Sequence, residues 1–117
     1  RWPDGPGSRF HLAVALLREL AGAQASAKRG LSASRLAEVL RTDPLQIEPI
    51  LDELLEMDWL GRLDEDGQPR FVLMCDVATT SAEELIARLL LEPSPELRAI
   101  WRRAGFGEMR LRELLGP

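Results

Sequence analysis

The chain has 117 residues, of which 45% are hydrophobic and 29% are charged, and this size and balance predict one globular domain with a single hydrophobic core. Its net charge of −4 gives no general attraction for polyanions, so nonspecific binding to nucleic acid or to anionic membranes is disfavoured. Cys75 is the only cysteine, which excludes an internal disulfide, and no apolar run reaches the ~18 residues that a membrane-spanning helix needs.

The first eight residues, RWPDGPGS, are rich in Pro and Gly and are typical of a linker. The chain also begins at Arg1 rather than at methionine. We therefore expect residues 1–8 to connect this domain to an upstream region of a longer protein.

An apolar period of 3.6 residues predicts a first helix over 9–24, with Ser8 as its N-cap. One face of this helix is apolar: Phe10, Ala13, Val14, Leu17 and Ala21, widened by Leu16 and Leu20. The other face carries His11, Ala15, Arg18 and Gly22. The pattern predicts an amphipathic helix, followed by a connector that ends at Gly30.

A second helix is predicted from Ser32 to about residue 41. Ser32 is a favourable N-cap, and Leu31 can pack on Leu36 as a hydrophobic staple. A short strand over 30–32 often completes the sheet of such a fold.

The third helix, over 44–57, has a strong start signal, with Asp43 as N-cap and Pro44 at the first helical position. Pro49 would remove a backbone hydrogen bond inside it, at a cost of ~3 kcal/mol. Either the helix kinks there or it begins at Glu48, and we favour the kink. The predicted core residues are Ile47, Ile50, Leu51, Leu54 and Met57, and the predicted outer face contains Glu48, Asp52, Glu53 and Glu56.

Two β-prone runs, 59–63 and 70–74, flank the turn-rich stretch 64–69 and predict a hairpin. Three helices followed by a hairpin is the order of the winged helix-turn-helix. We therefore predict a mainly α fold with a small β-hairpin, in which residues 9–76 form a winged-helix-like core.

Residues 77–117 are predicted to form a helical extension packed on that core, within one compact domain. Capping boxes formed by Thr80 and Ser81 with Glu83 and Glu84 predict a fourth helix that ends at 92–93. A fifth helix is predicted to start at Ser94 and Pro95 and to end at Gly105, and residues 109–115 to form a last turn or two.

The whole chain resembles the soluble C-terminal extension of the YihY/BrkB-like inner-membrane proteins of proteobacteria, some of which carry a ribonuclease BN label. The resemblance covers nearly all 117 residues and is carried by RFHLAVALLRELAGAQ, GLSASRLAEVLRTDPLQIEPILDELLEMDWLGRL, PRFVLMCD and IWRRAGF. It implies a domain on the cytoplasmic face of the bacterial inner membrane that follows the last membrane helix. Membrane association would then come through the upstream region of the full-length protein.

The sequence predicts no catalytic residue, cofactor or metal ion. His11 is the only histidine, so a nucleophile pair with Cys75 would depend on these two residues, and neither lies in a local signature of a nucleophilic enzyme. The ligands that zinc needs are absent. Asp64, Glu65 and Asp66 are consecutive residues of a turn, so their carboxylates should diverge rather than hold Mg²⁺. No small-molecule substrate is evident.

Binding to DNA is suggested by the fold and opposed by the charges. The third helix would place four acidic residues near phosphates, and only Gln46 could read a base. The hairpin offers Arg62 and Arg70, but its tip is acidic. Nucleic acid is therefore a disfavoured partner, and a winged-helix DNA-binding transcriptional regulator is the alternative to the function below.

The remaining class is a non-enzymatic interaction or regulatory domain, whose partner is a protein or a second copy of the chain. Opposite charges at its two ends suit contacts between proteins. Trp101 would serve as an anchor if it is exposed and as a core residue otherwise. The candidate interaction residues are Glu48, Asp52, Glu53, Glu56, Arg98, Trp101, Arg102 and Arg103.

Overall fold

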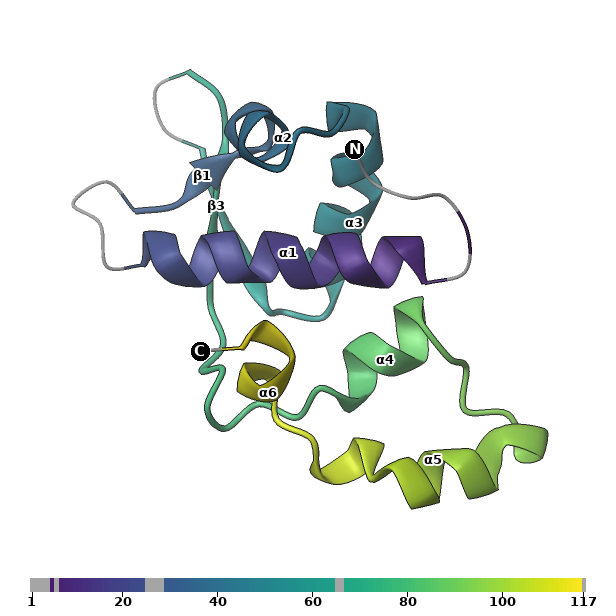
Figure 1. Cartoon of the computed structure of the whole chain (residues 1–117). Coiled ribbons are helices and arrows are strands. Elements are labelled where there is room, and N and C mark those ends of the chain that lie inside the picture. The colour runs from purple at the N-terminus through teal and green to yellow at the C-terminus, as the bar shows by residue number, and fades with distance from the viewer. Residues whose placement is uncertain (1–4, 6, 25–28, 65–66, 117) are drawn as a thin grey trace.

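The computed structural model describes residues 5, 7–24, 29–64 and 67–116, and Figure 1 shows how its elements are arranged. Two 3₁₀ turns, Pro95–Leu97 and Phe106–Glu108, flank the fifth helix. The helices and strands are, in chain order, α1 (Ser8–Ala23), β1 (Leu31–Ser32), α2 (Ala33–Leu40), α3 (Pro44–Glu56), β2 (Leu60–Leu63), β3 (Arg70–Leu73), α4 (Glu83–Leu89), α5 (Arg98–Ala104) and α6 (Leu111–Leu115).

The three strands form an antiparallel sheet in the order β1-β3-β2. In the hairpin Leu60 pairs with Leu73, and β1 is added at the other edge of β3, where Leu31 pairs with Phe71. The hairpin and the short strand before α2 are therefore confirmed. Of the predicted hairpin tip, residues 65 and 66 lie outside the described residues.

The helix-turn-helix has the predicted caps. The Ser32 hydroxyl accepts a hydrogen bond from the Arg35 N–H at 3.1 Å, and the Asp43 carboxylate accepts one from the Leu45 N–H at 2.8 Å. Because Asp43 fixes the start of α3, the helix runs through Pro49 as one element. The alternative start at Glu48 is therefore wrong.

The start of α1 differs from the prediction by one residue. Gly7, not Ser8, is the N-cap, with a left-handed backbone at φ 82°, and its carbonyl accepts the first hydrogen bond from the His11 N–H at 2.9 Å. Glycine reaches this conformation without steric cost. Ser8 therefore becomes the first helical residue, and the N-cap, Gly7, offers no side chain to cap the helix.

The prediction that Ala15 lies on an outer face of α1 is wrong. Ala15 is 6% exposed and Leu12 is 5% exposed, because α4 and α6 pack on the side of α1 that faces away from α2 and α3. Figure 1 shows α1 crossing the middle of the molecule, with the helix-turn-helix on one side and the C-terminal helices on the other. A helix that is covered on two sides needs more than one apolar stripe.

The extension is tied together by its backbone at one point. Ser81 pairs with Arg110 in an isolated β-bridge, and the Ala82 N–H donates to the Met109 carbonyl at 2.8 Å. Ala82 thus takes the N-cap position of α4, so the helix begins at Glu83 without a side-chain cap. The predicted capping by Thr80 and Ser81 is wrong in this respect, although the Ser81 hydroxyl still accepts from the Glu83 N–H at 3.1 Å.

The later boundaries follow the prediction in part. α4 ends at Leu89, before the predicted end at 92–93, and the predicted start of the fifth helix at Ser94 and Pro95 is a 3₁₀ turn, after which α5 begins at Arg98. α5 ends as predicted, with Gly105 as its left-handed C-cap at φ 70°. One hydrophobic cluster runs through the molecule. Its fully buried side chains come from the first three helices and from the extension: Leu16, Leu17, Leu20, Leu36, Ile47, Ile50, Leu51, Leu54, Leu85, Ile86 and Leu111.

Candidate interaction surfaces

The acidic residues of α3 divide into two pairs with different surroundings. Glu48 and Asp52 lie on the exposed side of the helix, toward the wing. Glu53 and Glu56 lie toward its C-terminal end, on the side that faces α4. The sequence grouped the four carboxylates as one outer face, but within the described residues the first pair makes no ion pair, whereas the second pair is bound by Arg88.

Arg88 of α4 binds the second pair. Its Nη1 lies 2.9 Å from Oε1 of Glu53 and 3.1 Å from Oε1 of Glu56, and its Nη2 lies 3.1 Å from Oε2 of Glu84. The two α3 carboxylates raise the pKa of Arg88 above its ordinary value. The Arg88 side chain is only 29% exposed, so this cluster joins α3 to α4 rather than offering free charge to a partner.

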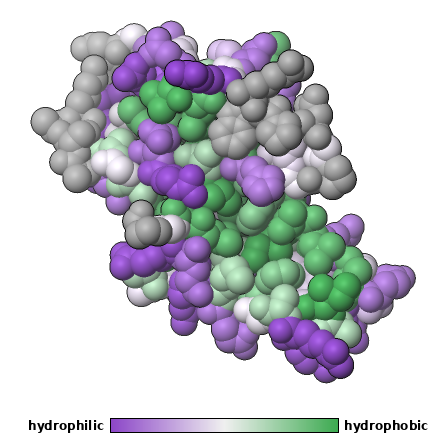
Figure 2. All heavy atoms as spheres, viewed as in Figure 1, coloured by the Kyte–Doolittle hydropathy of each residue, from purple (hydrophilic) through white to green (hydrophobic). Residues whose placement is uncertain are grey.

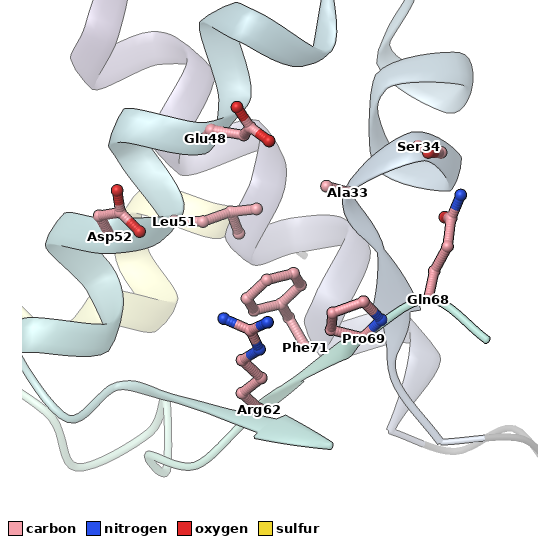
Figure 3. Close-up of a pocket in the computed structure, with 9 residues that line it drawn as sticks. All are labelled: Ala33, Ser34, Glu48, Leu51, Asp52, Arg62, Gln68, Pro69 and Phe71. Atoms are coloured by element: carbon pink, nitrogen blue, oxygen red, sulfur yellow. The ribbon is translucent and has the colours of Figure 1, made fainter. Parts of the chain in front are cut away.

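Glu48 and Asp52 form one wall of an open groove between α3, the start of α2 and the wing, with a volume of about 440 Å³. Figure 3 shows the Phe71 ring and Pro69 between this wall and the start of α2. The groove is lined by Ala33, Ser34, Glu48, Leu51, Asp52, Arg62, Gln68, Pro69 and Phe71. It thus combines two carboxylates with an apolar floor, which we call the α3–wing groove.

The α3–wing groove lies on the face that a winged-helix DNA reader turns toward the duplex. Its arginine, Arg62, is already engaged, because Nε donates to Oδ1 of Asp64 at 2.8 Å. Arg70 is half-buried in β3. Gln46 is exposed near the start of α3, but the carboxylates of Glu48 and Asp52 follow it along the helix. The charges of this face therefore oppose phosphate.

The second candidate surface is α5. Arg98, Arg102 and Arg103 are exposed. Trp101 is only 8% exposed and packs edge-to-face on Phe106, with ring centroids 4.9 Å apart. Trp101 therefore serves as a core residue, and the anchor role that required its exposure does not apply. Its indole N–H has no hydrogen-bond partner among the described residues.

The described residues bring together neither the His11 and Cys75 pair nor a set of metal ligands. His11 is exposed on α1, and within the described part of the chain no hydrogen bond joins it to Cys75. Burial raises the pKa of the Cys75 thiol, although a hydrogen bond with Thr80 opposes the shift, so the reactive thiolate is disfavoured. In residues 5, 7–24, 29–64 and 67–116, no group of three His, Cys, Asp or Glu side chains is placed to hold a metal ion. Glu65 and Asp66, weighed above as ligands, lie outside these ranges.

Sequence reasoning missed two features of these surfaces. The Arg88 cluster had a local signal only in the Glu84–Arg88 spacing of four residues, which places both on one side of a helix. No local sequence signal links Arg88 to its more distant partners, Glu53 and Glu56. The apolar floor of the α3–wing groove was also missed, because Pro69 and Phe71 read as ordinary hairpin residues.

The fold resembles those of winged-helix transcriptional regulators. CymR from Staphylococcus aureus superposes with a TM-score of 0.67 and 17% sequence identity, over 94% of this chain and 97% of that one. A putative transcriptional regulator from Lactobacillus plantarum gives a TM-score of 0.68 at 17% identity, over 88% of this chain and 84% of that one. At this identity the likeness confirms the winged-helix fold and carries no function.

The sequence relatives are membrane proteins, although no family model matches the chain. UPF0761 membrane proteins from Methylibium petroleiphilum and Verminephrobacter eiseniae are 61% and 37% identical, over 98% and 93% of this chain. A third, from Delftia acidovorans, is 37% identical over 98% of the chain. The chain spans only 28% to 30% of the length of these relatives, and no helix in its described residues is long and apolar enough to cross a bilayer. The chain belongs to the UPF0761 membrane proteins, the YihY/BrkB family that its sequence resembles.

Proposed function

We propose that this domain is a non-enzymatic interaction and regulatory domain on the cytoplasmic side of a polytopic bacterial inner-membrane protein. We further propose that the α3–wing groove binds a basic protein segment. Family membership supports the link to a membrane protein, and the chain's share of under a third of its relatives' length leaves room for a membrane region before it. The placement after the last membrane helix rests on the resemblance given above.

The observation that carries the proposal is the charge of the α3–wing groove. Glu48 and Asp52 are exposed on its wall, whereas Arg62 is held by Asp64 at 2.8 Å. A ligand entering the groove therefore meets two exposed carboxylates that make no ion pair within the described residues, and one guanidinium, that of Arg62, whose Nε is bound to Asp64. Carboxylates form their strongest hydrogen bonds with guanidinium and ammonium groups.

The apolar floor defines the ligand further. Phe71 and Pro69 lie beside the acidic wall (Figure 3), so the aliphatic stem of an arginine or lysine could rest on them while its charged head reaches Glu48 or Asp52. A guanidinium group could also stack on an aromatic ring. A protein segment with alternating basic and apolar residues fits both features.

A DNA-binding regulator is the second candidate, and the winged-helix fold is the observation that favours it. Affinity for DNA depends on cations that replace the counterions of phosphate. The α3–wing groove offers carboxylates at the position where those cations would be needed. We therefore rank this function below protein binding.

The test uses a fluorescent peptide of about ten residues that alternates arginine with leucine, titrated with the 117-residue chain and followed by anisotropy. We expect salt-dependent binding that Glu48→Lys/Asp52→Lys weakens by about tenfold or more, because each lost charge-assisted contact is worth roughly 1.5–3 kcal/mol. The matched control is Glu92→Lys/Glu108→Lys, which makes the same change in net charge at exposed positions away from the groove. An equal loss in both variants would mean that net charge alone attracts the peptide, and the proposal would be wrong.

A further inference from the structure

We propose that the outer face of α5 docks on the surface of an anionic phospholipid bilayer. This face consists of Ile100, Arg102 and Arg103, with Arg98 exposed in the first turn of the same helix, and we call it the α5 face. The inference is independent of what the α3–wing groove binds, since it concerns a different end of the molecule (Figure 1).

The packing of Trp101 fixes which side of α5 is outward. Trp101 is buried against Phe106, with ring centroids 4.9 Å apart, so the opposite side of this short helix must face solvent. At 100° per residue, Arg103 lies on that opposite side, with Arg102 and Ile100 flanking it. α5 therefore presents cationic and apolar side chains on one surface.

The arginines of α5 differ from several others in the chain in the partners of their guanidinium groups. Arg18 donates to the Leu115 carbonyl at 2.8 Å, and Arg62 and Arg88 are ion-paired with carboxylates. Within the described residues, the guanidinium groups of Arg98, Arg102 and Arg103 have neither an ion pair nor a hydrogen bond. They are available to an anionic surface.

An exposed apolar residue, Ile100, lies among these charges on α5 and is 52% exposed. Leu90 is also exposed, at 45%, but it lies near Gly7 at the start of α1. Leu89, Leu91 and Leu97 pack against the core. Figure 2 shows hydrophobic surface continuing over the lobe formed by α4 and α5, bordered by hydrophilic side chains. Basic and apolar residues together are the composition of surfaces that lie at a membrane interface.

The net charge of the chain does not exclude this contact, because the charge is unevenly distributed. Residues 93–117 contain five arginines and three glutamates, a net charge of +2, and the whole extension, residues 77–117, contains six of each and is neutral, so the net charge of −4 lies on residues 1–76. The molecule is 48 Å long, whereas the Debye length at physiological ionic strength is about 8 Å. Acidic residues at the far end are therefore screened from a bilayer that touches the α5 face.

A bilayer is the occupant that the family indicates. The relatives are membrane proteins of which this chain is less than a third, so in such a protein the domain is tethered close to a lipid surface. Tethering makes the docking step intramolecular, and weak contacts then suffice. Each arginine near an anionic surface adds to the attraction.

The test is co-sedimentation of the 117-residue chain with vesicles of phosphatidylglycerol and phosphatidylcholine, compared with vesicles of phosphatidylcholine alone, at ~50 mM salt. We expect partitioning only to the anionic vesicles, and we expect Arg102→Glu/Arg103→Glu to weaken it by about tenfold or more. The matched control is Arg35→Glu/Arg41→Glu, with the same charge change at exposed sites of α2 and its C-cap. This control should bind as the unchanged chain does.

A second pair of variants tests the apolar part and does not alter charge. Ile100→Ser should weaken partitioning, whereas Leu45→Ser, at a site that is 72% exposed on α3, should not. Absence of binding to anionic vesicles would overturn the proposal, as would equal losses in a variant and its control. Sedimentation without vesicles identifies the other occupant: if the unchanged chain self-associates and only the α5 variants are monomeric, the α5 face contacts a second copy and the bilayer proposal is wrong.

Discussion

Gly30 is the residue whose identity the backbone constrains most tightly. It has φ +83°, and a Cβ built on it would lie 2.8 Å from the carbonyl oxygen of Phe71 and 2.7 Å from Cγ1 of Val72. Both the left-handed backbone and the approach of β3 therefore exclude a side chain. The sequence marked Gly30 as the end of a connector and the start of a short strand, but it did not show the close contact with β3, which is some 40 residues away in the chain.

Gly30→Ala should destabilise the domain by clearly more than Gly67→Ala. Gly67 has a similar backbone, φ +85°, but no atom of the described residues lies within 4 Å of the added Cβ, so it isolates the cost of the left-handed conformation, roughly 1 kcal/mol. Urea unfolding of both variants measures the difference. Equal losses of stability would mean that β3 moves away freely and that the close approach has no energetic weight.

Helix caps are the residue-scale features that the sequence predicted best. Ser32, Asp43 and Gly105 act within one turn of their own position, so local chemistry determines them. Ser81 failed as a cap of α4 because a bridge to Arg110, a distant residue, sets the backbone there. Local signals predict local hydrogen bonds and cannot anticipate a competing long-range pair.

At the scale of elements, the acidic residues of α3 lie in two different surroundings. Glu48 and Asp52 face the α3–wing groove, and Glu53 and Glu56 are bound to Arg88 of α4. From the sequence, all four carboxylates share one polar helix face, since they have the same periodicity. Only the folded position of Arg88, more than 30 residues later, separates them.

Charge reversal of the two pairs should therefore have different effects on stability. Glu48→Lys/Asp52→Lys should change the free energy of unfolding by no more than ~0.5 kcal/mol per site, as surface substitutions usually do. Glu53→Lys/Glu56→Lys should lower the melting temperature further, because two ammonium groups would then face the Arg88 guanidinium.

Leu51→Ala is the reference for a large loss of stability in these melts. Leu51 is 2% exposed, so its truncation should cost ~2 to 5 kcal/mol. Thermal melts followed by circular dichroism compare the three variants with the unchanged chain. If Glu48→Lys/Asp52→Lys unfolds as easily as Leu51→Ala, the two acids belong to a structural network and the α3–wing groove is not a free binding surface.

At the scale of the whole molecule, the C-terminal extension covers a second side of α1. The helix lies between the helix-turn-helix and the C-terminal helices (Figure 1). Arg18 Nε of α1 donates to the Leu115 carbonyl of α6 at 2.8 Å, across the contact with the C-terminal helices. The sequence predicted an extension packed on the core. It did not predict which face was covered, because Ala15 and Gly22 are small enough to suit either solvent or a packed helix.

The fold was more predictable than the function for a physical reason. Helix periodicity, caps and the hairpin pattern are repeated along the chain and reinforce one another, so the winged-helix order could be read before the structure. The α3–wing groove depends on how α2, α3 and the wing converge, and residues such as Pro69 and Phe71 carry no local sign of it. Charge was the part of the surface that could be read in advance.

We propose that the interaction surface of this winged helix does not read DNA. Fluorescence anisotropy with duplex DNA is the direct measurement of this property. Labelled duplexes of about 25 base pairs, one random and one GC-rich, are titrated with the 117-residue chain at ~50 mM salt, where electrostatic binding is strongest. We expect no binding at protein concentrations up to ~100 μM, and therefore no anisotropy change that depends on the salt concentration. Micromolar or tighter binding, with a steep loss of affinity as salt is raised and a further loss in Arg62→Ala, would contradict it and make the domain a DNA reader.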